Sequence, residues 1–346
     1  MQDETEKFII DNLENHPNDI IAFTAGHFKT SRPAMQKRIN KLIADKLIER
    51  GSGKGRTPGY SLVTAEHFNI VGLDDESNKD ENVLFKKYIQ PYISDCPRTV
   101  QEKIDYIGGE ILNNAISHSG GKTLRIVVRK NVKELSVMFM DDGVGIFRKI
   151  QNGLGLFDPK EAILELCKGK YSSDPDNHSG EGIFFSSRMA DKFMLSSYGV
   201  GFVSEGDYGT IEDIDEGMEN VEGTGVWAFL EMDSTRTAAS VLDEYSNPDF
   251  LGGGVKTSIP LRAMLLEGGT LVSRSQGKRL MTRGERFRNV VLDFAEVEYI
   301  GQGFADEVFR VWRSKHPDVK VSYVNANDLV KKMILHVEAG MRQPQT

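Results

Sequence analysis

Residues 110–118 restrict the fold of this chain more than any other segment. Glu110, Asn114 and His118 recur every four residues, so on a helix their side chains lie on one face, one above the other. A carboxylate, an amide and an imidazole are costly to bury without partners. The predicted helix, at about 98–117, also has to pack four apolar side chains inward, namely Ile104, Ile107, Ile111 and Leu112. The triplet is therefore either a solvent-facing stripe or part of a polar site.

Two predicted strands follow this helix and lead into an acidic turn that contains glycine. Gly120-Gly121 ends the helix, as glycine does past a helix C-terminus. Residues 123–129 alternate and are rich in β-branched side chains, and residues 134–140 are nearly all apolar, so we expect both to be strands. The second strand runs into Asp141-Asp-Gly-Val-Gly145. Gly143 and Gly145 permit a tight turn and a close approach of the backbone to a ligand.

A long connection separates this turn from a second motif that contains glycine. Residues 146–179 are predicted to contain one helix, at about 161–167, followed by Lys168 and Lys170, which could reach a ligand or simply be solvated. Connections of this length are usually lids or binding loops, or else disordered. Gly180-Glu-Gly182 then opens a helix, and the free N–H groups at such a start suit phosphate. Strands are expected at 193–198, 201–205 and 223–231, with a solvated hairpin or loop at 207–222.

In their order along the chain, these motifs resemble the GHKL ATP-binding fold of gyrase-type ATPases, histidine kinases and anti-sigma kinases. The four are Glu-x-x-x-Asn-Ala-x-x-His at 110–118, Asp-x-Gly-x-Gly at 141–145, Gly-x-Gly at 180–182 and Gly-Thr at 223–224. Each motif alone is degenerate, but all four in order, on the expected elements, are specific. The resemblance covers about residues 70–232 and favours the polar site over the solvent-facing stripe.

The resemblance implies ATP and Mg²⁺ as cofactors and gives particular residues a role. Asn114 would hold the Mg²⁺ that bridges the phosphates, because a hard ion accepts an amide oxygen well. Glu110 would be the catalytic residue that activates water for ATP hydrolysis, although kinases of this fold also carry an acidic residue there. Asp141 would bind the adenine amino group. The implied nucleotide contacts are Asn114, Asp141, Gly143, Gly145, Gly180, Gly182 and Thr224, while no catalytic role follows for His118.

Residues 1–68 are predicted to form a small helical unit with a basic hairpin. Thr30-Ser31-Arg32-Pro33 is typical of a helix start, and residues 49–60 of a glycine-rich hairpin. Residues 29–56 contain nine basic side chains and two acidic ones. The pattern resembles a winged helix-turn-helix domain, which implies DNA binding by the third helix and the wing, with protein contacts alone as the alternative. The expected DNA contacts are Arg32, Gln36, Lys37, Asn40, Lys41, Lys54 and Arg56.

A connector is expected at 235–254, before a C-terminal domain at 255–346. Strands and helices alternate in this last part, which predicts a covered sheet. The Val-Leu-Asp-Phe strand at 291–294, leading to Gly301-Gln-Gly303, resembles a STAS-like domain, the fold of anti-sigma antagonists. Antagonists phosphorylated by anti-sigma kinases carry Ser or Thr just before this helix, whereas residues 293–313 contain neither. The resemblance therefore implies a protein-interaction domain that is not phosphorylated there in cis.

Composition limits the remaining function classes. No apolar run reaches the roughly 20 residues that span a bilayer, and the acidic N-terminus lacks a signal-sequence pattern, so we expect no membrane association. Two cysteines, Cys96 and Cys167, have no metal-ligand spacing and indicate a reducing, cytoplasmic setting. The formal net charge of −8 argues against nucleic-acid binding by the whole molecule, but not by one basic module.

The predicted fold is multidomain α/β: a winged helix, then a GHKL α/β sandwich at 69–234 with a mixed sheet covered by helices, then a STAS-like domain. The function expected first is an ATP-gated signalling or transcription regulator whose nucleotide state controls a DNA-binding head and a protein-interaction domain. One alternative is a partner-switching serine/threonine protein kinase that acts on a separate protein. Another is an ATP-stabilised scaffold. A single winged helix reads half of a symmetric site, which would suit a homodimer.

Overall fold

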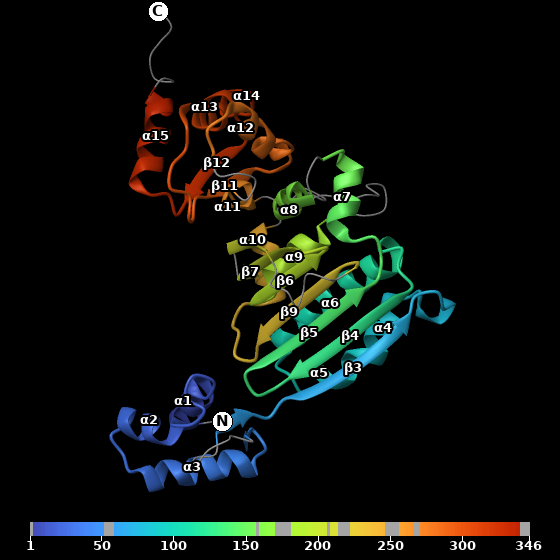
Figure 1. Ribbon diagram of the computed structural model, residues 1–346, viewed down its shortest axis with the longest axis vertical. Coiled ribbons are helices and arrows are strands. Elements are labelled where there is room, and N and C mark those ends of the chain that lie inside the picture. The colour runs from blue at the N-terminus through green and yellow to red at the C-terminus, as the bar shows by residue number, and fades with distance from the viewer. Residues whose placement is uncertain are drawn as a thin grey trace, which may run out of the picture.

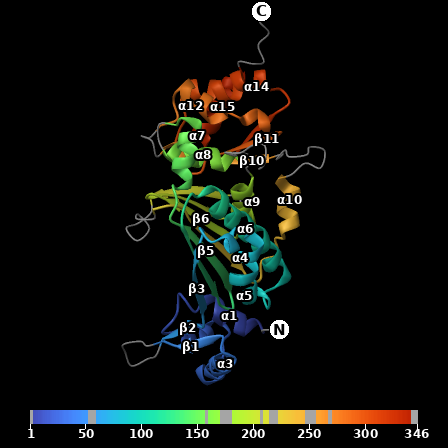
Figure 2. The same cartoon turned by 90° about the vertical axis from the view of Figure 1, so that its right-hand side faces the viewer.

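The computed structural model describes residues 3–51, 59–156, 159–169, 181–205, 208–213, 222–245, 256–265 and 270–339. Within these ranges the chain is an α/β protein with sheets of two, seven and three strands. An N-terminal unit, a middle unit and a C-terminal unit follow one another along the long axis of the molecule (Figure 1). The view turned by 90° shows the same order (Figure 2).

The N-terminal unit is a group of helices with a short hairpin. Its described elements are α1 (Glu4–Asn12), α2 (Ile20–His27), α3 (Arg32–Ala44), β1 (Ile48–Arg50) and β2 (Tyr60–Leu62), and the two strands are antiparallel. The predicted start of α3 is confirmed, because the Ser31 hydroxyl accepts a hydrogen bond from the Ala34 N–H and Pro33 lies in the first turn. The unit has a core of its own, made by Ile9, Ile10, Leu13, Ile20, Ile39, Leu42, Ile48, Tyr60 and Leu62.

A seven-stranded sheet organises the middle unit. Its order is β3 (Ala65–Gly72), β4 (Thr123–Lys130), β5 (Glu134–Asp141), β9 (Gly225–Glu231), β6 (Lys192–Ser197), β7 (Val200–Glu205) and β8 (Tyr208–Asp213). Every described pair in it is antiparallel, so the expectation of a mixed sheet is wrong here. Short hairpins join β4 to β5 and β6 to β7, and a hairpin joins only antiparallel neighbours. Tyr198 and Gly199 form the second loop with φ angles of 52° and 74°.

Helices cover one face of this sheet (Figure 1). They are α4 (Glu81–Tyr88), α5 (Gln90–Ile93), α6 (Arg98–His118) and α9 (Gly182–Met189), with the 3₁₀ turn η1 (Glu76–Asn78) before α4. In β4, the residues Leu124, Ile126 and Val128 are buried beneath the helices, whereas Arg125 and Arg129 are exposed. The helix predicted around the Glu110 triplet and the two strands after it are therefore confirmed.

Three features differ from the sequence prediction. The connection after Gly145 contains two helices, α7 (Ile146–Leu154) and α8 (Pro159–Lys168), where the sequence predicts one. The expected connector contains α10 (Ala238–Tyr245). β3 also runs through residues 68 and 69, where the sequence predicts a domain boundary. Residues 146–154 do carry apolar side chains at helical spacing, which the sequence prediction overlooked, whereas the other short segments give weak periodic signals and depend on tertiary packing.

The C-terminal unit is a three-stranded parallel sheet with helices, in agreement with its alternating pattern. The strands are β10 (Lys256–Pro260), β11 (Asn289–Asp293) and β12 (Lys320–Val324). The helices are α11 (Arg262–Leu265), α12 (Arg274–Met281), α13 (Gln302–Asp306), α14 (Arg313–Lys315) and α15 (Asp328–Ala339). The 3₁₀ turn η2 (Gly284–Arg286) follows α12, and a π-helical stretch, η3 (Glu307–Trp312), joins α13 to α14.

The middle and C-terminal units share one hydrophobic core, which the core of the N-terminal unit does not join. α8 lies between the large sheet and the C-terminal unit in both views (Figure 1, Figure 2). Its residues Ala162, Ile163, Leu164 and Leu166 are buried. A helix from the connection after Gly145 therefore helps to hold these two units together.

Candidate functional site

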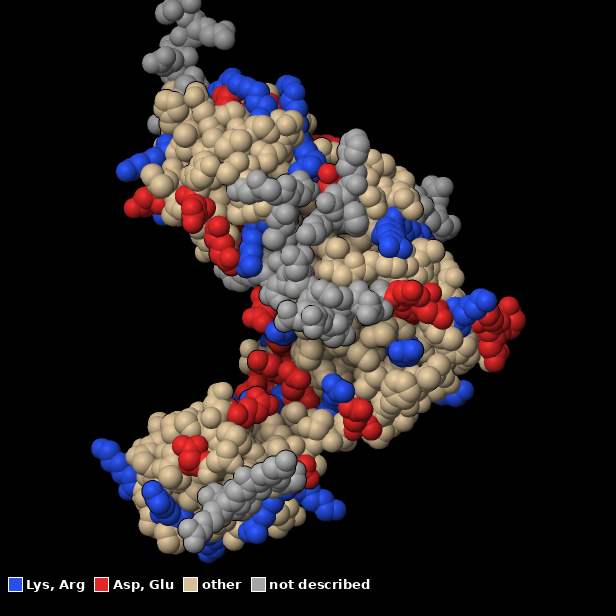
Figure 3. All heavy atoms as spheres, viewed as in Figure 1, with Lys and Arg blue, Asp and Glu red and all other residues tan. Residues whose placement is uncertain are grey.

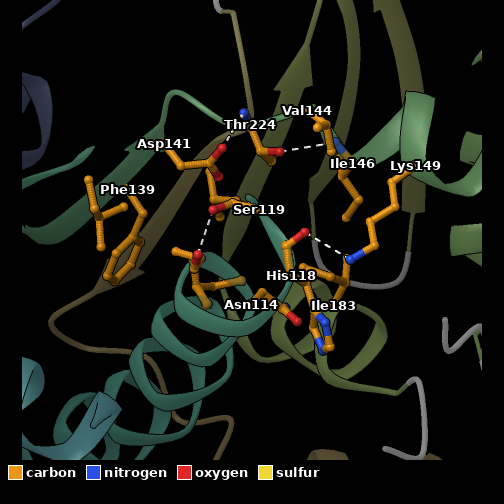
Figure 4. A pocket seen from close by; sticks show the side chains of 15 residues that line it. Asn114, His118, Ser119, Phe139, Asp141, Val144, Ile146, Lys149, Ile183 and Thr224 are labelled. Carbon is orange, nitrogen blue, oxygen red and sulfur yellow. Dashed lines mark hydrogen bonds between the residues drawn. The ribbon is translucent and has the colours of Figure 1, made fainter. Parts of the chain in front are cut away.

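The pocket that the motifs predict lies between α6, the end of β5 and the start of α7 (Figure 4). Together with open solvent at its mouth, the pocket leaves about 520 Å³ free of protein atoms. Its wall consists of Ile111, Ala115, Leu124, Phe139, Val144, Ile146, Ile183 and Val226, together with Asn114, His118, Ser119, Asp141, Gly145, Lys149 and Thr224. A mainly apolar wall with a few polar groups is suited to a flat ring whose orientation is fixed by hydrogen bonds.

Asp141 forms the acidic side of the pocket, at the last position of β5. Its Oδ1 accepts hydrogen bonds from the backbone N–H groups of Gly143 at 2.8 Å and Thr224 at 3.2 Å. No other donor in the described ranges reaches this carboxylate. Burial raises the pKa of Asp141 above its ordinary value of 3.8, although the two backbone hydrogen bonds oppose the shift. A buried carboxylate held through one oxygen can accept an N–H donor of a ligand through the other.

Two of the predicted glycines are required by the turn beside Asp141. Gly145 has a φ of 82°, and a Cβ atom there would collide with the Ser197 hydroxyl at 2.4 Å. A Cβ atom at Gly143 would lie 2.2 Å from the backbone carbonyl oxygen of Ser119, at the end of α6. A side chain at either position would push the turn away from α6 or β6, and so open the acidic side of the pocket.

Lys149 provides a cation on the other side of the pocket, away from Asp141 (Figure 4). Its Nζ donates a hydrogen bond to the backbone carbonyl of His118 at 2.8 Å. Burial lowers the pKa of Lys149 below its ordinary value of 10.5, and no charged group contributes to that shift. An ammonium whose partner is a neutral carbonyl oxygen can exchange it for an anionic group of a ligand. The side chains of Asn114 and His118 line the same part of the wall.

Thr224 connects the two sides. Its backbone N–H donates to Asp141, and its hydroxyl accepts a hydrogen bond from the Ile146 N–H at 3.0 Å, where α7 begins (Figure 4). One residue of the Gly-Thr motif therefore positions both the carboxylate and the helix that carries Lys149.

Glu110 lies one helical turn before Asn114 and contacts the start of α9. A Cβ atom at Gly182 would lie 2.1 Å from its Oε2, so glycine there leaves room for the carboxylate. Burial raises the pKa of the nearby Tyr106 above its ordinary value of 10, and the charges of Glu110 and Glu181 add to the shift. The described residues that line the pocket include Asn114 and His118, but not Glu110.

The structure therefore brings some of the predicted site residues together and leaves others apart. Those that line the pocket are Asn114, Asp141, Gly145 and Thr224, with Gly143 in the adjoining turn and Gly182 at the start of α9. Gly180 lies outside the described residues. Sequence reasoning missed Lys149, whose position four residues after Gly145 would have shown it once α7 was recognised as a helix that begins at the pocket.

The residues present fit a magnesium ion that is held mainly by phosphate oxygens of a bound molecule rather than by the protein. Asn114 is half-buried in the pocket wall, and its amide can supply one hard oxygen. Within the part of the chain that the structure describes, no group of three His, Cys, Asp or Glu residues could hold a metal. Mg²⁺ usually keeps several waters and binds one or two protein oxygens besides phosphate oxygens, so one amide oxygen is compatible with an ion that arrives with a nucleotide.

The predicted DNA contacts that the structure describes lie on α3. Arg32, Lys37, Asn40 and Lys41 are exposed, and the half-buried Gln36 donates to Asn40 at 3.0 Å. Lys41 also pairs with the buried Glu6 of α1 at 2.6 Å, which directs its ammonium toward α1. Lys and Arg side chains are spread over the outer surface of this unit (Figure 3). Lys54 and Arg56 lie outside the described residues.

Lys168 neither lines the pocket nor faces solvent, so both expectations for it are wrong. It is buried, and its Nζ donates to Glu165 at 2.7 Å and to the backbone carbonyls of Arg279 and Thr282 at 3.2 Å each. The reason is that α8 packs against the C-terminal unit. Lys170 lies outside the described residues.

Comparison with known families identifies part of the C-terminal unit. Residues 276–331 match the model of a STAS-like domain of unknown function (DUF4325). The chain is thus an α/β protein with a STAS-like domain at its C-terminal end, as that part of the sequence predicts. None of the curated proteins compared with the chain matches it. In the described ranges, no helix is long and apolar enough to cross a membrane.

Proposed function

We propose that the pocket binds ATP with Mg²⁺ and that its nucleotide state regulates the N-terminal unit and the STAS-like domain. The observation that carries the proposal is the polarity of the pocket: the buried carboxylate of Asp141 on one side, the ammonium of Lys149 on the other, and an apolar wall between them. A purine with an amino group suits the first side and the wall, and phosphates suit the second. The order of the four sequence motifs supports the same ligand.

Each pocket residue has a separate role in this proposal. Asp141 accepts a hydrogen bond from the amino group of adenine, and Phe139 and Val226 pack beside the ring. Lys149 leaves the His118 carbonyl and binds a phosphate oxygen. Asn114 gives its amide oxygen to the metal ion. Glu110, one turn earlier on α6, is the candidate for the base that activates water, which would make the protein an ATPase.

The N-terminal unit is proposed as a DNA-binding winged helix and the STAS-like domain as the contact for a protein partner. Exposed basic residues on α3 support the first role. Nucleotide alters DNA affinity only if it binds two arrangements of the units with different affinities. DNA affinity is therefore expected to differ between the nucleotide-free, ATP and ADP forms at one salt concentration.

Isothermal titration of the purified protein with ATP and with GTP, with Mg²⁺ and with chelator, tests the site. We expect GTP to bind about tenfold or more weakly, because guanine presents a carbonyl oxygen where Asp141 needs a donor. Chelator should weaken ATP binding. Phosphate release by the wild type and by Glu110→Ala, with and without DNA, then separates hydrolysis from binding alone. Equal affinities for ATP and GTP, or no binding of either, would contradict the proposal.

A further inference from the structure

α8 presents a charged stripe to the STAS-like domain. Its members, Glu161, Glu165 and Lys168, are three or four residues apart and share one face of the helix. Arg279 near the end of α12 donates to Glu161 at 2.9 Å, and Arg283 just after α12 donates to Glu165 at 3.2 Å. The two acidic side chains of the stripe therefore each bind an arginine of the STAS-like domain.

Lys168 adds a positive charge to this contact. Besides Glu165, it binds the carbonyls of Arg279 and Thr282 at the end of α12, where the helix dipole favours a cation. The side chains of Lys168 and Glu165 are only 2% and 8% exposed. Buried charges of this kind are tolerated only while they are paired. Either all of these pairs are formed, or the charged side chains are exposed to solvent.

Arg283 adopts a backbone conformation that suggests more than packing. Its φ is 66°, in the left-handed region that residues other than glycine rarely occupy. This conformation belongs to the residue whose guanidinium reaches Glu165. Such positions are kept where the surroundings hold them, and they concentrate at binding and switching sites.

The same connection touches the pocket at its other end. α7 begins at the pocket wall, where Ile146 is bonded to Thr224 and Lys149 to the His118 carbonyl. α7 then packs against α8, and the two helices lie side by side in both views (Figure 1, Figure 2). A continuous series of contacts therefore leads from the pocket through α7 and α8 to α12.

We infer that α8 couples the pocket to the STAS-like domain, and that docking of the Glu161–Glu165–Lys168 stripe on the end of α12 lowers the affinity of the pocket for nucleotide. This inference rests on the proposed function of the pocket. Lys149 has to leave the His118 carbonyl to reach a phosphate, and a docked α8 resists the accompanying shift of α7. By thermodynamic linkage, nucleotide weakens the docking by the same factor. A partner that holds α8 on the STAS-like domain would therefore inhibit the pocket.

The test uses the full chain and two measurements: ATP affinity by isothermal titration and amide hydrogen exchange in residues 159–168. Arg283→Ala removes one partner of the buried Glu165. It is expected to speed exchange in α8 and to lower the Kd for ATP about fivefold or more, the lower end of typical couplings. Arg283→Lys keeps the charge and is expected to stay closer to the wild type. Arg313→Ala, which removes an arginine–glutamate pair with Glu338 between α14 and α15, is the matched control.

The outcomes separate the two proposals. An unchanged or higher Kd in Arg283→Ala, whatever the exchange in α8, would overturn the coupling while leaving the nucleotide site intact. A wild-type protein that binds no ATP would overturn the proposed function, and the coupling with it. Glu161→Gln, at the more exposed Arg279 contact, carries the same expectations and replaces Arg283→Ala if that variant does not fold.

Discussion

Asp141 and Lys149 carry opposite charges on two sides of the pocket, and each can be changed with at most one hydrogen bond of the pocket wall lost. An asparagine at 141 keeps an oxygen for the Gly143 and Thr224 N–H groups. A methionine at 149 loses only the bond to the His118 carbonyl. The two ends of the proposed nucleotide site can therefore be tested separately.

Asp141→Asn is expected to reduce ATP affinity about tenfold or more, because a hydrogen bond to a charged group contributes about 1.5–3 kcal/mol. Since burial raises the pKa of Asp141 above 3.8, wild-type affinity should also fall as the pH falls through that raised pKa. The variant should lack this pH dependence. Titrations at several pH values measure both effects. Asp142→Asn is the control, because its exposed carboxylate binds the backbone N–H groups of Lys122 and Thr123 instead; a similar loss there would argue against a specific role for Asp141.

Lys149→Met is expected to weaken binding of ATP and ADP about tenfold while leaving adenosine binding nearly unchanged, because only the phosphates need the ammonium. Competition titrations with the three ligands measure the difference. Arg148→Met is the neighbouring control, because that guanidinium stacks on the Tyr198 ring at 3.2 Å. An equal loss for adenosine would mean that Lys149 maintains the shape of the pocket rather than binding phosphate.

Asp141 and Lys149 differ in how far their place in the pocket can be predicted from the sequence. Asp141 is predictable because Gly143 and Gly145 follow it, and their close contacts admit few other residue types. Lys149 is not, since lysines are common on helix surfaces and nothing in the local pattern distinguishes this one. The prediction for Lys168 is wrong for another reason. Its ammonium binds the backbone carbonyl of Arg279, which is 111 residues away in sequence.

At the scale of elements, α3 gives the most direct test of DNA binding. Arg32→Ala and Lys37→Ala are each expected to weaken binding and to lower the slope of log affinity against log salt by about 1, because each removes one phosphate contact. Lys41→Ala should have a smaller effect, since its ammonium already pairs with Glu6. Fluorescence anisotropy over a salt series measures the slopes. Lys331→Ala, exposed on α15, should leave the slope unchanged; the same change in that variant would indicate a general charge effect.

Elements with long, regular patterns follow from the sequence, and short ones do not. α6 spans 21 residues with a clear apolar face, and β4 is a run rich in β-branched residues with buried side chains at 124, 126 and 128, so both are predictable. α7 and α10 are 9 and 8 residues long. Isolated helices of that length are marginal, and contacts with α8 and α9 supply the stability that their sequences lack.

At the scale of the whole molecule, an acidic notch separates the N-terminal unit from the large sheet (Figure 3). Its lining includes Asp11, Glu14, Glu134, Glu231 and Asp233, and also Lys7, Lys133, Ile10, Asn131, Val132 and Met232. Lys7 of α1 binds Asp233 across the notch at 2.6 Å. This ion pair therefore bridges two units whose facing surfaces carry mainly acidic side chains, with Lys133 as a further cation in the lining.

Acidification is expected to close this notch. Burial, followed by the charges of Glu14 and Glu231, raises the pKa of Glu134 above its ordinary value of 4.5. A raised carboxyl pKa favours the compact arrangement fully below 4.5, and the contribution is lost as the pH rises through the raised value. X-ray scattering should therefore give a smaller radius of gyration near that pKa than at neutral pH. Glu134→Gln should remove the difference, whereas Glu76→Gln, exposed in η1, should keep it; a wild-type radius independent of pH would refute the expectation.

The shared core around α8 also determines which parts of this chain evolution could exchange. The N-terminal unit has its own core, against which Val132 of the middle unit also packs, so recombination after β2 could supply a different head with little apolar surface exposed. Recombination after α10 would instead leave α8 and its charged stripe facing a foreign domain, with Glu165 and Lys168 deprived of their partners in the STAS-like domain. The middle unit and the STAS-like domain should therefore be inherited together, and compensating changes between them should appear in α8 and at the end of α12.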